Sequence, residues 1–119
     1  MMRLGLKVRL ANERGESFMG GGLLELLRRI DRVDSIHRAA AEMGLSYAKA
    51  LKILNRLEAN LGAPVLERAR GGRERGGARL TPFGKVLVRE YGSLQERIVR
   101  HGEARFPLFL RRIAAAREK

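Results

Sequence analysis

The strongest constraint on the fold of this chain is a very short break between two helical stretches near its middle. Ser35 can cap a first helix, and Gly44 suits the position just after its last turn. A single residue separates this glycine from Ser46, which is a good N-cap for a second helix. Residues 39–41 are all alanine, so the two helices can approach each other closely. The sequence therefore predicts a helix-turn-helix over residues 35–62.

The second helix of this pair has one apolar side and one basic side. Its leucines recur at steps of three, three and four, which is helical spacing, before Gly62 ends the helix. These leucines are Leu51, Leu54, Leu57 and Leu61. Lys49, Lys52 and Arg56 lie off the stripe, so we expect them to face solvent. An ordinary solvated helix face would show the same charges, and Tyr47 could equally be a core aromatic.

The predicted helix pair with its basic second helix is suited to binding DNA. In a DNA-binding helix-turn-helix the second helix enters the major groove, and its N-terminal residues meet the base edges. Ser46 can cap the helix and also donate to a phosphate, while Lys49 can reach either a guanine edge or a phosphate. The candidate contacts on this helix are Ser46, Tyr47, Lys49, Lys52 and Arg56.

A basic, glycine-rich loop follows the helix pair. Residues 64–68 are partly apolar and extended, residues 70–77 carry two glycine pairs around a basic tip, and residues 78–80 return as a strand. Between Arg68 and Leu80 there are five arginines and one glutamate. A flexible linker could have this composition, but the position after a recognition helix favours a β-hairpin wing over residues 64–81. Its candidate DNA contacts are Arg70, Arg73 and Arg75.

The N-terminal part of the chain predicts a second small β-hairpin. Apolar and other residues alternate over residues 3–10, which indicates a half-buried strand. Residues 11–16 are polar with a glycine, and residues 17–19 could return as a short partner strand, giving a hairpin over residues 3–19. After the glycine triplet, the spacing becomes helical from Leu23 onward.

A long helix is predicted to follow the wing. Thr81 can serve as its N-cap and Pro82 as its first residue. The apolar residues Phe83, Leu87, Tyr91, Leu94 and Ile98 then step by four, four, three and four, as a paired helix needs. We expect Leu87, Tyr91, Leu94 and Ile98 to form a dimer interface. Gly102 is predicted to end this helix, and Pro107 to separate it from a last short helix.

The net charge favours a polyanionic partner. The chain has 119 residues, with 25 Lys and Arg against 13 Asp and Glu, for a formal net charge of +12. A surplus of this size on a small protein points to nucleic acid, although solubility alone could also explain it. No apolar run approaches the roughly 20 residues that span a bilayer. The first ten residues lack the unbroken apolar stretch of an export signal, so we expect a cytoplasmic protein that does not bind membranes.

The sequence offers little for catalysis. It has no cysteine, and its two histidines, His37 and His101, lie far apart on different predicted helices. No group of His, Asp and Glu has metal-ligand spacing, and the glycines at 20–22 lack the Lys-Ser/Thr of a phosphate-binding loop. We therefore expect no enzyme activity, no metal and no cofactor.

Taken in chain order, these elements predict a mainly α fold with a small β content. The order is N-terminal β-hairpin, helix-turn-helix, wing and long C-terminal dimerisation helix, which is a winged helix-turn-helix. We expect a DNA-binding domain over residues 1–81, and a linker or dimerisation helix with a short final helix over residues 82–119.

Two stretches resemble the N-terminal domain of ModE-type molybdate-responsive regulators. Residues 35–51, SIHRAAAEMGLSYAKAL, are similar to the family pattern S-I-S-x-A-A-x-x-x-G-M-S-Y-x-x-A. The glycine pairs at 71–72 and 76–77, with ARLTPFG at 78–84, resemble the family's wing and the start of its linker helix. More broadly, residues 55–58 and 61–68 are similar to LysR-type DNA-binding domains. The resemblance covers roughly residues 3 to 100.

This resemblance implies a winged helix-turn-helix dimer in which the helix from Pro82 pairs two subunits. It also implies DNA contacts by Ser46, Tyr47, Lys49 and Lys52, and by the wing residues Arg70, Arg73 and Arg75. Two positions depart from the pattern: His37 replaces a small polar residue, and Ala48 stands where a basic residue is common. Family members continue into oxyanion-binding domains, whereas this sequence stops at Lys119, so the resemblance does not extend to molybdate sensing.

The function expected from the sequence is that of a sequence-specific DNA-binding transcriptional regulator. We expect it to bind double-stranded DNA as a homodimer, with no oxyanion-binding domain in this chain. Two alternatives use the same surfaces. The protein could coat nucleic acid without sequence preference, as nucleoid-type proteins do. It could also act as an adaptor that dimerises with a full-length regulator through the helix from Pro82.

Overall fold

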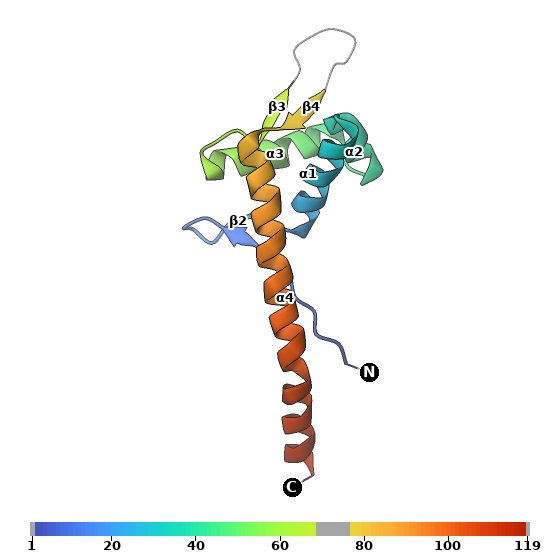
Figure 1. Cartoon of the computed structure of the whole chain (residues 1–119), viewed down its shortest axis with the longest axis vertical. Helices are drawn as coiled ribbons and strands as arrows, with labels where there is room; N and C mark the ends of the chain where they lie inside the picture. The colour runs from blue at the N-terminus through green and yellow to red at the C-terminus, as the bar shows by residue number, and fades with distance from the viewer. Residues whose placement is uncertain (1, 69–76, 119) are drawn as a thin grey trace.

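The computed structural model describes residues 2–68 and 77–118. Short helices and two small β-ladders form a head, from which one long helix extends as a stalk (Figure 1). The elements in order are β1 (Leu10–Ala11), β2 (Ser17–Met19), α1 (Gly21–Val33), α2 (Ile36–Glu42), α3 (Tyr47–Leu61), β3 (Leu66–Arg68), β4 (Ala78–Leu80) and α4 (Pro82–Arg117). The stalk makes the molecule elongated, with extents of 71 × 29 × 22 Å. The predicted mainly helical fold with a small β content and a long C-terminal helix is confirmed.

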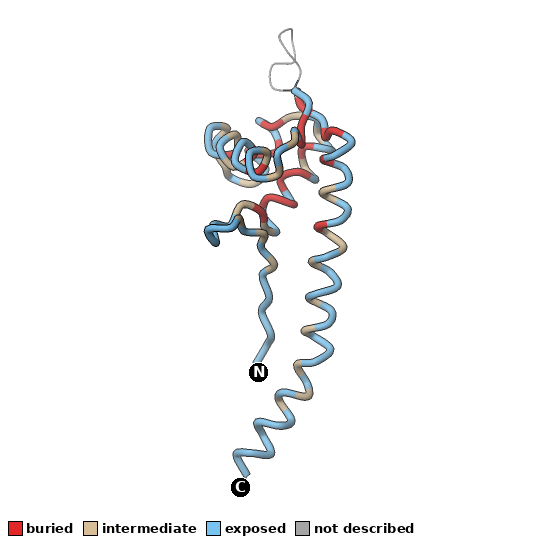
Figure 2. The backbone as a smooth tube through the Cα atoms, turned by 90° about the vertical axis from the view of Figure 1, so that its left-hand side faces the viewer, coloured by how far each residue is buried: buried red, intermediate tan, exposed pale blue. Residues whose placement is uncertain are grey.

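The hydrophobic core lies in the head and is built mainly from α1, α2 and α3 (Figure 2). Its fully buried large side chains are Met19, Leu26, Leu27, Ile30, Ile36, Leu54, Leu57 and Val65. Small residues stand where the helices come closest: Ala39, Ala40 and Ala50 are at most 1% exposed. Because alanine leaves room for a neighbouring backbone, Ala39, Ala40 and Ala50 allow α2 and α3 to pack tightly, whereas Ala41 is exposed.

The root of the wing and the start of α4 form one tightly packed junction. Strands β3 and β4 are antiparallel, with Leu66 opposite Leu80. Thr81 caps α4 as predicted: its Oγ1 accepts a hydrogen bond from the N–H of Gly84 at 2.9 Å and donates one to the carbonyl of Pro64 at 2.8 Å. A Cβ atom at Gly84 would overlap the carbonyl oxygen of Val65, so the helix can approach this close only with glycine here.

The N-terminal hairpin is shorter than the sequence predicts. Only Leu10–Ala11 is a strand, and it pairs with β2. Residues 2–9, which we call the N-terminal segment, instead run alongside α4 (Figure 1). The hydroxyl of Tyr91 on α4 donates a hydrogen bond to the carbonyl of Val8 at 2.6 Å, and a Cβ atom at Gly102 would lie 2.6 Å from Leu6 Cδ1. The alternating apolar side chains thus meet a helix rather than a second strand.

Helix α4 does not end where the sequence predicts. It continues through Gly102 and Pro107 to Arg117, so the predicted stop and the separate short helix are both wrong. Gly102 is a contact position, because the side chains of the N-terminal segment lie against it. Pro107 removes one helical hydrogen bond, but it is exposed, so water can bind the carbonyl that is left free. Strong helix formers in the last three turns favour continuation.

Candidate nucleic-acid interface

The turn between α2 and α3 has the geometry that its sequence predicts. Ser35 and Ser46 each accept a hydrogen bond at 3.1 Å from a backbone N–H in the first turn of their helices. Gly44 has a left-handed backbone with φ of +70°, which favours glycine. The N–H of Leu45 then donates to the carbonyl of Ala40 at 2.9 Å. These bonds fix the angle at which α3 leaves the head.

The basic side of α3 is open to solvent. Lys49, Lys52 and Arg56 are all exposed, while Leu54 and Leu57 on the opposite side are fully buried. Within residues 2–68 and 77–118, neither lysine forms an ion pair, and Arg56 has only a long one, at 3.9 Å. The spacing of three and four residues places the three cations along one face of the helix. A phosphate backbone can therefore approach Lys49 and Lys52 without displacing an ion pair among the described residues, and at Arg56 it competes only with this long one.

Tyr47 occupies a more ordered position than the sequence suggests. It is the first residue of α3 and is half-buried. Its ring stacks on the imidazole of His37 from α2, with centroids 3.9 Å apart and planes inclined by only 9°. His37 itself is exposed. The sequence does not predict this stack, because no local pattern links His37 to a residue ten positions further along the chain.

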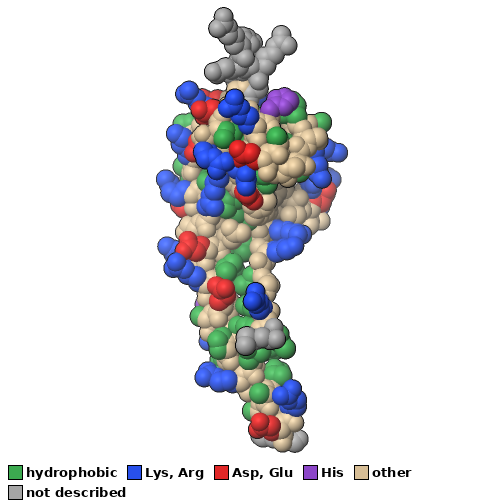
Figure 3. All heavy atoms as spheres, turned by 90° about the vertical axis from the view of Figure 1, so that its right-hand side faces the viewer, with side chains coloured by type: hydrophobic (Ala, Val, Ile, Leu, Met, Phe, Trp, Pro, Cys, Tyr) green, Lys and Arg blue, Asp and Glu red, His purple; other side chains and the backbone are tan. Residues whose placement is uncertain are grey.

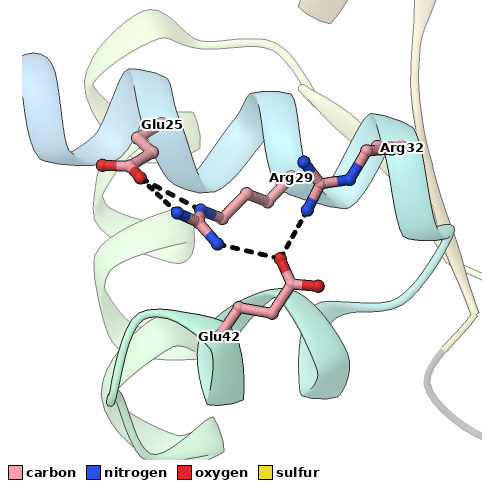
Figure 4. A network of polar contacts seen from close by, with 4 residues as sticks. All are labelled: Glu25, Arg29, Arg32 and Glu42. Atoms are coloured by element: carbon pink, nitrogen blue, oxygen red, sulfur yellow. Dashed lines mark hydrogen bonds and ion pairs between the residues drawn. The ribbon is translucent and has the colours of Figure 1, made fainter.

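A polar network fastens the helix-turn-helix to α1 (Figure 4). Arg29 Nη2 lies 2.6 Å from Glu25 Oε1, and Arg29 Nη1 lies 2.9 Å from Glu42 Oε1. Arg32 reaches the same oxygen of Glu42 at 2.6 Å. The hydrogen bond to Glu25, followed by that to Glu42, raises the pKa of Arg29 above its ordinary value, so the guanidinium stays charged. The end of α2 is thereby tied to the basic face of α1.

Glu58 joins α3 to the wing. Its Oε2 accepts hydrogen bonds from the N–H groups of Val65 at 2.7 Å and Leu66 at 3.3 Å. Its Oε1 lies 3.5 Å from Arg68 Nη2, which also donates to Asn55 at 3.1 Å. One carboxylate on the second helix of the pair thus sets the direction in which the wing leaves the head.

The far side of the wing root contacts the beginning of α2. The N–H of Ala78 donates to the carbonyl of Asp34 at 3.1 Å, and Gly77 forms an isolated bridge with Ser35. Both strands of the wing are therefore anchored to the helix-turn-helix. The predicted contact residues Arg70, Arg73 and Arg75 lie outside the described residues.

The predicted dimer residues of α4 separate into two groups. Leu94 and Ile98 are 44% and 41% exposed, as an unpaired interface would be. Tyr91 is only 3% exposed and belongs to the core of its own protomer, while Leu87 is half-buried against that core. Tyr91, one of the four predicted dimer residues, therefore contacts its own protomer instead of lying on an open face. Figure 3 shows apolar side chains along the stalk and basic ones spread over the head.

The described part of the chain has neither a metal-binding cluster nor a helix that could span a membrane. Between residues 2–68 and 77–118, no three His, Cys, Asp or Glu side chains come together as a metal site would require. Over the same residues, no helix has the length and apolarity needed to cross a bilayer.

An exposed basic helix that follows a tight turn, leads into a β-hairpin and then into a long helix defines a winged helix-turn-helix DNA-binding domain. Residues 22–85, more than half of the chain, match the sequence pattern of the bacterial regulatory helix-turn-helix proteins of the lysR family. The chain belongs to this family. Its class is that of DNA-binding transcriptional regulators.

Relatives by sequence confirm the resemblance to ModE-type regulators. The chain is 42% identical over 83 residues to the molybdenum-pterin-binding protein MopB of Rhodobacter capsulatus, covering 70% of this chain and 31% of MopB. It is 34% identical over 73 residues to the DNA-binding transcriptional dual regulator ModE of Escherichia coli K12, covering 61% of this chain and 28% of ModE. The chain thus spans about a third of the length of these relatives.

Solved structures share the fold. The DNA-binding domain of CbnR in complex with DNA matches 82% of this chain and 99% of its own, with a TM-score of 0.58 and 24% identity. The DNA-binding domain of BenM in complex with a catB site matches 78% of this chain and 92% of its own, with a TM-score of 0.52 and 22% identity. The winged helix-turn-helix predicted from the sequence is therefore confirmed.

Proposed function

We propose that this chain is a sequence-specific DNA-binding regulator that acts as a homodimer. The observation that carries the proposal is the open basic face of α3, where Lys49, Lys52 and Arg56 are exposed. The first residues of this helix enter the major groove, where Lys49 reaches a base edge or a phosphate. Ser46 contacts a phosphate while capping the helix. The wing arginines Arg70, Arg73 and Arg75 follow the neighbouring phosphates or the minor groove.

Dimerisation is the second part of the proposal. The exposed apolar side chains of α4, Leu94 and Ile98 among them, are an unpartnered strip that a second copy of the helix can cover. Leu87 lines the edge of the strip, next to the protomer's own core. A two-fold dimer presents two recognition helices to two half-sites of a pseudo-palindrome, whose spacing the dimer sets. Its binding partner is the chromosome, so we propose that the protein works in the cytoplasm.

The matched region makes up only 31% of the molybdenum-pterin-binding protein MopB and 28% of the Escherichia coli ModE. We therefore confine the proposed function to DNA binding and assign no effector. The relatives are regulators or binding proteins by name, and we propose no catalytic activity for this chain.

Selection of DNA sites from a random pool with the purified protein tests sequence specificity. We expect a selected site to bind at least on the order of 10³ times more tightly than random DNA at the same salt concentration. Equal affinity for both would support the nucleoid-type alternative and contradict the proposal. Recovery of the protein only as a heterodimer with a longer regulator would support the adaptor alternative.

A double variant, Lys49→Ala with Lys52→Ala, tests the placement of the recognition helix. Each base contact that is lost should cost about 1–3 kcal/mol of binding free energy and relax the sequence preference, whereas a lost phosphate contact weakens all sites equally. The matched control is Arg111→Ala with Arg112→Ala, which removes the same charge from exposed positions far along α4. Unchanged binding by the lysine double variant would reject this surface as the DNA-binding face.

A further inference from the structure

Two aromatic rings lie together where α3 begins, and only Tyr47 is among the DNA contacts expected from the sequence. His37 and Tyr47 are stacked nearly parallel, with a centroid distance of 3.9 Å. Tyr47 is half-buried and His37 is exposed, so the imidazole covers one face of the phenol ring on the surface of the head. A stack of this kind restricts the rotation of both side chains.

Within residues 2–68 and 77–118, the hydroxyl of Tyr47 makes no hydrogen bond, and no buried side-chain polar atom there lacks a partner. Tyr47 is only half-buried, so these residues leave its hydroxyl in reach of a ligand. A phenol ring held rigidly with its hydroxyl free can donate or accept a hydrogen bond without losing further conformational freedom.

We propose that His37 is a positioning residue for DNA recognition, which holds the ring of Tyr47 so that its hydroxyl meets the DNA at the N-terminus of α3. This role rests on the proposed function, because Tyr47 is a DNA contact only if α3 is the recognition helix. Because the stack already orders the Tyr47 side chain in the free protein, less conformational entropy is lost on binding. Removing the stack therefore weakens binding to the preferred site. Contacts made by Lys49 and Lys52 with phosphates do not depend on the stack.

The test compares His37→Ser, which removes the ring, with His37→Phe, which keeps a ring of similar size. We expect His37→Ser to weaken binding to the selected site about threefold to tenfold, the range expected for one side chain that must be ordered on binding. Binding to random DNA and the melting temperature should change little, because His37 is exposed. His37→Phe should restore the wild-type affinity. The matched control is His101→Ser, at the other histidine, which is exposed on α4.

A double-mutant cycle with Tyr47→Phe separates positioning from direct contact. If His37 acts through the hydroxyl, His37→Ser should cost less affinity in the Tyr47→Phe background than in the wild type. Equal losses in the two backgrounds, or failure of His37→Phe to restore binding, would overturn the positioning role. Wild-type-like selectivity of His37→Ser would overturn it as well and leave the regulator proposal intact. Equal binding of selected and random DNA by the wild type would defeat both proposals.

Discussion

Removing the carboxylate of Glu58 should loosen the wing from the recognition helix. This side chain accepts hydrogen bonds from the N–H groups of Val65 and Leu66, at 2.7 and 3.3 Å. Val65 is fully buried, so Glu58→Ala leaves its N–H without the charged acceptor that it has in the native protein. A hydrogen bond to a charged group contributes about 1.5–3 kcal/mol, and the longer second bond adds little. We expect the free energy of unfolding to fall by about 2–3 kcal/mol.

Thermal unfolding followed by circular dichroism measures this change. For a domain of this size each kcal/mol shifts the melting temperature by about 4 °C, so Glu58→Ala should melt about 8–12 °C lower. Glu58→Gln keeps one carbonyl oxygen as an acceptor and should lose about half as much. The matched control is Glu67→Ala, which removes an exposed glutamate from β3 and should stay within about 0.5 kcal/mol of wild type.

The position of the wing should change as well as the stability. At a temperature well below its melting point, Glu58→Ala should bind the selected DNA site more weakly than Glu67→Ala does, because its wing is no longer held against α3. A melting temperature within about 2 °C of the control would refute the reasoning, since the N–H of Val65 would then need another partner.

Three further predictions concern α4. Gly84→Ala should destabilise the protein by about 1–3 kcal/mol, because the new Cβ overlaps a backbone oxygen at the wing root. The control is Gly22→Ala in α1, where a Cβ atom has open space around it, and this variant should not lower the melting temperature. Tyr91→Phe should cost about 1 kcal/mol through its lost hydrogen bond. Burial raises the pKa of Tyr91 above its ordinary 10.0. The tyrosine of the unfolded chain therefore ionises at a lower pH than that of the folded protein, and the free energy of unfolding falls as the pH rises past 10. Between pH 9 and pH 11 the melting temperature of Tyr91→Phe should fall less than that of the wild type, and an identical fall would contradict this. Leu94→Glu and Ile98→Glu should each give monomers in light scattering, and an intact dimer would exclude this strip as the interface.

The helix-turn-helix and the caps could be predicted because their signals are local. A serine before a helix and a glycine after it act through bonds to neighbours within four residues, and Ser35, Ser46 and Thr81 all make the predicted contacts. The exposure of Lys49 and Lys52 follows in the same way from their positions off the apolar stripe. These features need no knowledge of which distant segments meet.

The misplaced elements depend on contacts that a local pattern does not contain. The alternation over residues 3–10 predicts an extended segment with one apolar side, but it does not indicate whether a strand or a helix covers that side. The apolar stripe of α4 includes Tyr91, whose burial depends on the N-terminal segment beside it. Glycine and proline are common at helix ends. In this helix, however, Gly102 is a packing contact and Pro107 is tolerated because it is exposed.

The shared junction between wing and stalk makes the head and the far end of α4 mechanically interdependent. Thr81 and Gly84 hold the first turn of the helix against Pro64 and Val65, the two residues just before strand β3. With 36 residues the helix is about 54 Å long, so a tilt of about 5° at this junction moves its far end by about 5 Å. A movement of the distal turns of α4 by about 5 Å therefore corresponds to a rotation of only about 5° at the wing root, so the long helix converts a large distal displacement into a small angular one.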